Sequence, residues 1–237
     1  MQTILKPTLI IALIAFAASM ALSHINKVTL QRIKERELQK KEEALKIVLP
    51  GYTIVEKDKV LQVEGKDFRY SRAEKQVDKD VVSAYAFETE KAGYSGLIKS
   101  VIGVDENMKI LGMAIIQQSE TPGLGARSVE IASKETFFGH FFGSSAAGTG
   151  EVLAPWFQEQ FKGLDLSRKI GIMKKGEWRS ENEALKKELL ESNSVSAITG
   201  ATITTKAVRD SLEIKTEILK KLIQMETEKR KEDKKKK

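Results

Sequence analysis

Two short segments of the sequence carry residue types that suit a phosphate-bearing ligand. The first, Glu-Thr-Pro-Gly-Leu-Gly at 120–125, predicts a turn whose two glycines let backbone amides approach a ligand closely. The second, Thr-Gly-Ala-Thr-Ile-Thr-Thr at 199–205, sets hydroxyl groups beside small residues, directly before a predicted helix. The free N–H groups and the dipole of a helix start attract a phosphate. Each segment also has a simpler interpretation: a turn for the first, and helix capping by Thr204 or Thr205 for the second.

Other site chemistries find little support in the sequence. The chain has no cysteine, which excludes disulfides, thiol chemistry and cysteine-ligated zinc or iron–sulfur clusters. Its two histidines, His24 and His140, lie far apart without a nearby ligand pattern. We therefore predict no metal site and no catalytic acid or base.

Strand and helix patterns flank the two segments. Two apolar runs, 96–104 and 109–117, enclose a short polar turn and predict a β-hairpin directly before the first segment. An amphipathic helix is predicted after the second, because apolar residues recur there three and four positions apart. The other predicted elements are β-like stretches at 52–55, 60–63 and 81–87 and a helical turn at 155–161. Together they predict an α+β domain in which an antiparallel sheet is flanked by helices.

The N-terminus predicts a membrane anchor. Residues 8–25 form an almost unbroken apolar run of eighteen residues, just long enough to cross a bilayer as a helix. A cleaved signal peptide is the alternative, since Ala21-Leu22-Ser23 resembles a cleavage site. We favour the anchor because the run is long for a signal peptide and continues into a helical pattern. Both interpretations place the body of the protein outside the cytoplasm.

The rest of the chain divides by composition. We predict an anchor at 1–26, a helical stalk at 27–50 that ends at Pro50-Gly51, one domain at 51–225 and a charged tail at 226–237. The net charge of +7 is concentrated at the ends, and residues 229–237 hold seven basic and two acidic side chains. A run of this kind is usually a solvated tail, so we expect no nucleic-acid partner. A Phe- and Gly-rich stretch at 126–154 predicts a surface loop, or alternatively a loop that faces a partner or a membrane.

These motifs together resemble a known family. The stretch AGYSGLIKSVIGVDENMKILGMAIIQQSETPGLG at 92–125 closely resembles the FMN-binding domain of the G protein of the Rnf electron-transport complex. It is also similar to the C component of the sodium-translocating NADH:quinone reductase. The motif order matches as well: hairpin, ETPGLG, a Trp-containing segment, TGAT and a final helix. The likeness covers most of residues 50–222.

The resemblance implies a cofactor and a site. In that family, a separate flavin transferase joins FMN by a phosphoester to the last threonine of the Ser/Thr-Gly-Ala-Thr motif, which here is Thr202. The residues implied to contact the cofactor are Thr202, Thr199, Gly200, Ala201, Thr204, Thr205, Glu120, Thr121, Pro122, Gly123, Leu124 and Gly125. The resemblance also implies an electron-transfer subunit of a membrane-bound, ion-translocating oxidoreductase complex, with other subunits as partners and no turnover of its own. It implies a single-pass protein of the cell inner membrane whose flavin domain lies on the periplasmic side.

One departure from the family pattern leaves an alternative open. Family motifs usually carry an aspartate three residues before the attachment motif, and here that position is Ser196. Weaker recognition by the transferase would favour a second hypothesis: an extracytoplasmic, non-redox binding or assembly protein that keeps the fold without covalent flavin. Between the two complexes, the modest length of the chain favours the Rnf type over the quinone-reductase type.

Overall fold

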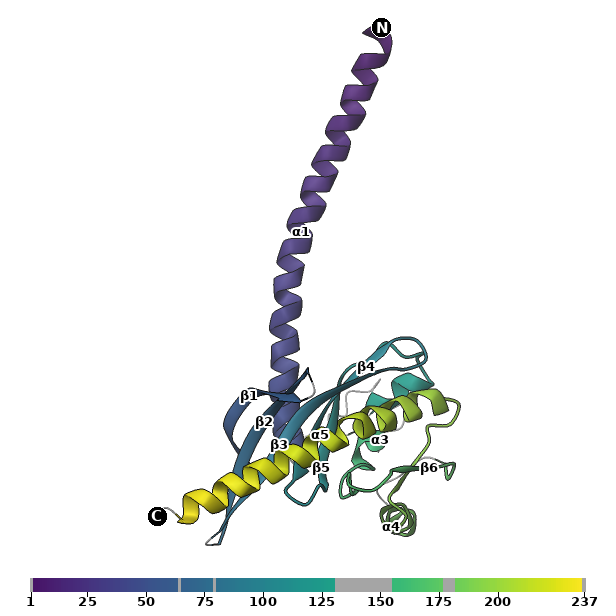
Figure 1. The fold of residues 1–237 in the computed structure, drawn as a ribbon. Coiled ribbons are helices and arrows are strands. Elements are labelled where there is room, and N and C mark those ends of the chain that lie inside the picture. The colour runs from purple at the N-terminus through teal and green to yellow at the C-terminus, as the bar shows by residue number, and fades with distance from the viewer. Residues whose placement is uncertain (1, 64, 79, 131–154, 177–181, 236–237) are drawn as a thin grey trace, which may run out of the picture. The chain divides into compact units, whose positions relative to one another are not determined.

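The computed structural model describes residues 2–63, 65–78, 80–130, 155–176 and 182–235 (Figure 1). These residues form two compact units, 1–42 and 43–237. The predicted Phe- and Gly-rich loop lies mostly outside the described residues. The elements are α1 Gln2–Val48, β1 Thr53–Val63, β2 Lys66–Val77, β3 Asp80–Ala92, β4 Leu97–Asp105, β5 Ile110–Gln117, η1 Gly125–Val129, α3 Trp156–Glu159, β6 Gly171–Met173, α4 Glu183–Glu191, β7 Ser194–Ser196 and α5 Thr202–Lys235.

The first unit consists of the greater part of α1. Its apolar residues, such as Leu13 and Phe16, are exposed along the helix. Among the described residues, α1 alone is long and apolar enough to cross a membrane, and no part of its apolar window is buried by the protein itself. The predicted helix at 8–25 is therefore confirmed, and its composition suits contact with lipid.

The second unit is built on a five-stranded antiparallel sheet with the strand order β1-β2-β3-β4-β5. The predicted hairpin is confirmed as β4 and β5, which pair with Val101 opposite Ala114. Consecutive strands are neighbours throughout, so every connection within the sheet is a hairpin. Together with the flanking helices, this sheet confirms the predicted α+β class.

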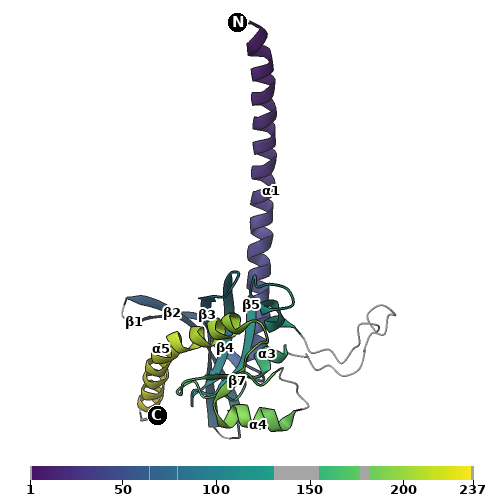
Figure 2. The same ribbon diagram turned by 90° about the vertical axis from the view of Figure 1, so that its right-hand side faces the viewer.

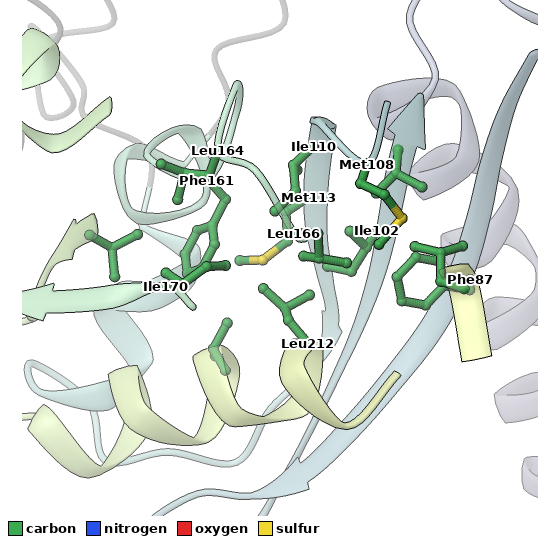
Figure 3. Packing of buried hydrophobic residues seen from close by; sticks show 14 of the residues in the cluster. Phe87, Ile102, Met108, Ile110, Met113, Phe161, Leu164, Leu166, Ile170 and Leu212 are labelled. Atoms are coloured by element: carbon green, nitrogen blue, oxygen red, sulfur yellow. The ribbon is translucent and has the colours of Figure 1, made fainter. Parts of the chain in front are cut away.

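Large side chains cover one face of the sheet. Phe87, Ile102 and Met113 point from the strands towards α5 and the segment around Phe161, and all of them are buried (Figure 3). Leu212 on α5 is completely buried in the same cluster. The apolar stripe of α5 packs on this face, which fixes where the helix crosses the sheet (Figures 1 and 2).

The opposite face carries small residues, and the end of α1 packs there. Val48 and Leu49 are buried against alanines of the strands and against Val101. Gly103 and Gly112 lie opposite each other on β4 and β5, directly beneath Val48. A Cβ atom at Gly103 would overlap the carbonyl oxygen of Val48, so glycine is required for this close approach.

Several elements differ from the sequence prediction. The stretches predicted at 52–55 and 60–63 form one strand, β1, whose register shifts near Glu56 and Lys59. The sequence did not predict β2, because charged residues interrupt its alternation and its inward positions include small residues such as Ala73. It also did not predict α4, whose buried face consists of Leu185 and Leu189, or the parallel pair β6 and β7, whose three-residue strands are too short to show an alternation.

The C-terminal helix continues past the predicted domain end. The expected boundary between 225 and 226 falls inside α5. Glu226 is 6% exposed and pairs with Arg72 of β2 at 3.1 Å. Arg230 pairs with Glu106, which follows β4. Both residues attach this part of α5 to the sheet.

Candidate functional site

The two segments singled out in the sequence meet at one pocket. It has a volume of about 390 Å³, within the range of about 300–1,000 Å³ usual for small-molecule sites. Its lining residues come from the β3–β4 turn, the loop after β5 and the start of α5, and they are Tyr94, Glu120, Thr121, Leu124, Gly125, Gly200, Ala201, Thr202, Ile203 and Thr204. The site is therefore assembled by tertiary contacts, since Glu120 lies 25 positions after Ser95 and 84 positions before Thr204.

The start of α5 supplies hydrogen-bond donors to this pocket. The helix begins at Thr202, and its first backbone hydrogen bond runs from the Thr205 N–H to the Ala201 carbonyl at 3.2 Å. Helix geometry leaves the N–H groups of Thr202, Ile203 and Thr204 without acceptors inside the helix. Gly200 has φ +78°, a conformation that allows the chain to turn sharply into the helix. The half-buried Thr202 thus lies where a phosphate is favoured.

Glu120 connects the three segments of the pocket. Its side chain is 5% exposed and accepts hydrogen bonds from the Thr204 hydroxyl on α5 and from the Ser95 N–H at 3.0 Å. A Cβ atom at Gly93 or Gly125 would come within 2.5 Å of a carboxylate oxygen, so two glycines provide the space for this group. Glu120 therefore ties the β3–β4 turn and the start of α5 to the loop that carries it.

The environment of Glu120 favours the ionised carboxylate. Burial on its own raises the pKa, but hydrogen bonds from Thr204 and from the backbone of Ser95, Tyr94 and Gly96 outweigh it and lower the pKa below its ordinary value. The pocket lining thus includes a carboxylate whose negative charge is stabilised by hydrogen bonds.

Most of the predicted site residues line the pocket, and four do not. Thr199, Pro122 and Gly123 are exposed and are not among its lining residues. Thr205 is fully buried, and its hydroxyl accepts from the Ile198 N–H and donates to the Ala201 carbonyl. It stabilises the chain before the helix, which matches the simpler capping interpretation.

Two lining residues, Tyr94 and Ile203, were not among the predicted ones. Ile203 follows Thr202 directly, so its place in the motif was a sufficient signal. Tyr94 lies in the stretch that resembles the family, but nothing in the sequence shows that the β3–β4 turn reaches α5.

Ser196 lies in β7 and is fully buried. Its hydroxyl donates to the Gly176 carbonyl, and its N–H donates to Gln160 at 2.7 Å. It is not among the residues that line the pocket. The polar groups of this serine are thus satisfied by Gly176 and Gln160, outside the pocket.

The sequence of the chain matches the profile of a known protein family. The sequence profile of the FMN-binding domain family matches residues 93–214, just over half of the chain. The matched range includes the pocket segments from Tyr94 to Thr204. The chain belongs to the FMN-binding domain family, which confirms the resemblance seen in its motifs.

Relatives in this family are components of ion-translocating complexes. The G component of the Na⁺-translocating ferredoxin:NAD⁺ oxidoreductase complex of Acetobacterium woodii is 26% identical over 230 residues, 93% of this chain and 94% of that protein. The G component of the ion-translocating oxidoreductase complex of Salmonella typhi is 30% identical over 158 residues, 64% of this chain and 75% of that protein. Among solved structures, the C component of the Na⁺-translocating NADH-quinone reductase of Parabacteroides distasonis shares 19% identity, with a TM-score of 0.47. That match covers 81% of this chain and 96% of the other.

Proposed function

We propose that this protein is an electron-transfer subunit of a membrane-bound, ion-translocating oxidoreductase complex of the Rnf type, with FMN attached to Thr202 through a phosphoester. The observation that carries this proposal is the position of Thr202, half-buried in the pocket and at the first position of α5. The family match and the relatives from ion-translocating complexes supply the class of cofactor and of complex.

The residues of the pocket fit FMN. The N–H groups at the start of α5 would bind the phosphate oxygens, and the hydroxyl of Thr202, the first residue of that helix, would supply the ester oxygen. In the net reaction, the Thr202 oxygen displaces a nucleoside monophosphate from a dinucleotide form of the flavin, and the leaving phosphate takes the threonine proton. The protein becomes heavier by FMN minus water. A separate flavin transferase would catalyse this step. The bound flavin would accept electrons and pass them on, while the protein fixes its position and potential.

The attachment is tested by expressing the full chain with and without an active flavin transferase. We expect an intact mass increased by FMN minus water and a fluorescent denatured band, both only with the transferase. Thr202→Ala removes both signals, and the matched control Thr53→Ala, an exposed threonine on β1, keeps them. If the wild-type chain carries no adduct although the transferase is active, the covalent bond is excluded. The alternative hypothesis, a non-redox binding or assembly protein, is then favoured.

The flavin domain is proposed to lie on the periplasmic side of the inner membrane, with α1 as the anchor. Because the chain has no cysteine, a single introduced thiol is the only labelling site, and its labelling reports on which side of the membrane the domain lies. Glu217 has 76% of its side chain exposed, so Glu217→Cys presents a reactive thiol. We expect labelling by a membrane-impermeant maleimide once the outer membrane is permeabilised. Labelling only after cell lysis would place the domain in the cytoplasm.

A further inference from the structure

The part of α1 that directly follows the apolar run is basic. Residues 27–36 hold four basic side chains and one acidic side chain, a net charge of +3. The basic residues are Lys27, Arg32, Lys34 and Arg36, and all of them are exposed. The acidic residue, Glu35, accepts a hydrogen bond from the neutral Gln31 at 3.4 Å. The segment therefore presents an excess of positive charge to its surroundings.

The basic side chains lie at the depth of the lipid headgroups when α1 crosses a bilayer. The apolar run ends at Ile25. A helix rises about 1.5 Å per residue, so Lys27 lies about 3 Å and Arg32 about 10 Å beyond that end. The headgroup layer on each side of a bilayer is about 5–8 Å thick. Side chains of a helix tilt towards its N-terminus, here towards the membrane, so long basic side chains reach back into this layer.

The basic residues lie on opposite sides of the helix. Lys27 and Lys34 are seven positions apart and share one side, whereas Arg32 and Arg36 are four positions apart and share the other. A partner protein would contact one side of the helix, but headgroups surround a membrane-spanning helix completely. The distribution of charge therefore favours lipid over a protein partner.

Exposed apolar side chains alternate with the basic ones in the same segment. Val28 is 52% exposed, Leu30 is 48% exposed and Ile33 is 46% exposed. A helix that mixes apolar and basic side chains suits the boundary between acyl chains and headgroups. The apolar stems of lysine and arginine add to this contact while their charges stay at the polar surface.

We infer that residues 27–36 of α1 bind the phosphate headgroups of anionic lipids around the anchor. The guanidinium groups of Arg32 and Arg36 suit bidentate hydrogen bonds to phosphate oxygens. The inference rests on α1 crossing a membrane and not on the flavin site. It is also independent of the side on which the domain lies, because phosphate headgroups cover both surfaces of a bilayer.

The test uses the full chain in vesicles of phosphatidylcholine with a minor fraction of phosphatidylglycerol. Because the chain has no cysteine, Gln39→Cys accepts a single donor fluorophore. This position is exposed and lies about 21 Å beyond Ile25 along the helix. Energy transfer is measured to acyl-labelled phosphatidylglycerol and, separately, to acyl-labelled phosphatidylcholine. The ratio of the two reports how strongly the anionic lipid gathers around α1.

Two double variants remove the charge from one side of the helix each. They are Lys27→Gln with Lys34→Gln and Arg32→Gln with Arg36→Gln. Glutamine is a good helix former, so α1 should keep its structure, and the helix content is checked by circular dichroism.

The control, Lys186→Gln with Lys187→Gln, removes the same charge from exposed positions of α4. We expect more transfer to phosphatidylglycerol than to phosphatidylcholine for the wild type and the control. Each double variant should lower this preference by up to about fivefold for each charge removed, and added salt should weaken it.

Equal transfer to both lipids in the wild type would overturn the inference. A preference that persists in both double variants would do the same, because it would come from another part of the chain. A decrease in one double variant alone would show a one-sided contact and favour a protein partner instead. The measurement needs no flavin, so each of these outcomes leaves the proposed function to its own test.

Discussion

Glu120 offers the most direct test of how the pocket is held together. Replacing it by alanine removes the acceptor of the Thr204 hydroxyl and of the Ser95 N–H. Thr204 is 1% exposed, so water cannot readily take the place of the carboxylate. Ser95 is exposed, and water can replace Glu120 there. The decrease in the free energy of unfolding should therefore come mainly from the lost hydrogen bond to Thr204 on α5.

The expected magnitude follows from these contacts. A hydrogen bond to a charged group contributes about 1.5–3 kcal/mol, and a buried donor without an acceptor costs about 1–3 kcal/mol. After allowing for water at Ser95, we expect Glu120→Ala to lower the free energy of unfolding by about 2–4 kcal/mol. Glu120→Gln should cost about 1 kcal/mol, because the amide keeps the shape and can still accept from Ser95 and donate to Thr204.

Denaturant unfolding of the detergent-solubilised chain measures both values, with Glu90→Ala as the control, since Glu90 is an exposed carboxylate on β3. The pH dependence is a second readout. Because the folded pKa of Glu120 is lowered, its stabilisation is present above the ordinary glutamate pKa and is lost as the pH falls through the folded value. Wild type should lose more stability than Glu120→Ala between about pH 6 and about pH 3. Equal unfolding midpoints for Glu120→Ala and Glu90→Ala would refute the reasoning.

Three further predictions concern the scaffold. Gly103→Val should destabilise the domain by at least about 1–3 kcal/mol, because its side chain would overlap the Val48 carbonyl, and a thermal melt that matches wild type would contradict this. Glu226→Ala should cost about 1–3 kcal/mol in denaturant unfolding, since it leaves the partly buried Arg72 without its 3.1 Å partner, and an unchanged midpoint would show that the pair contributes nothing. Burial raises the pKa of Tyr85 from 10.0 to about 12, so wild-type stability should fall as the pH rises through this interval. Tyr85→Phe should weaken that fall, and an identical pH profile would exclude Tyr85 as its source.

Much of the site could be predicted because its motifs are local. The segments 120–125 and 199–205 carry turn and helix-start chemistry in their own residues, and the structure brings both to one pocket. The β4–β5 hairpin was predictable for the same reason, since two apolar runs around a polar turn specify it. The strand β2 was not, because Arg72 interrupts the apolar alternation that Phe68 and Tyr70 begin, and its partner Glu226 lies on the distant helix α5.

The sequence alone determined the apolar N-terminal helix, the hairpin, the amphipathic C-terminal helix and the motif that ends in Thr202. Each depends on periodicity or on residues within one short segment. Only the tertiary structure decided that Glu120 contacts Thr204, that Tyr94 borders the same pocket and that Thr205 is buried away from it. These outcomes depend on how α5 packs across the sheet. That packing is set by large side chains on one sheet face and small ones on the other, distributed over the whole domain.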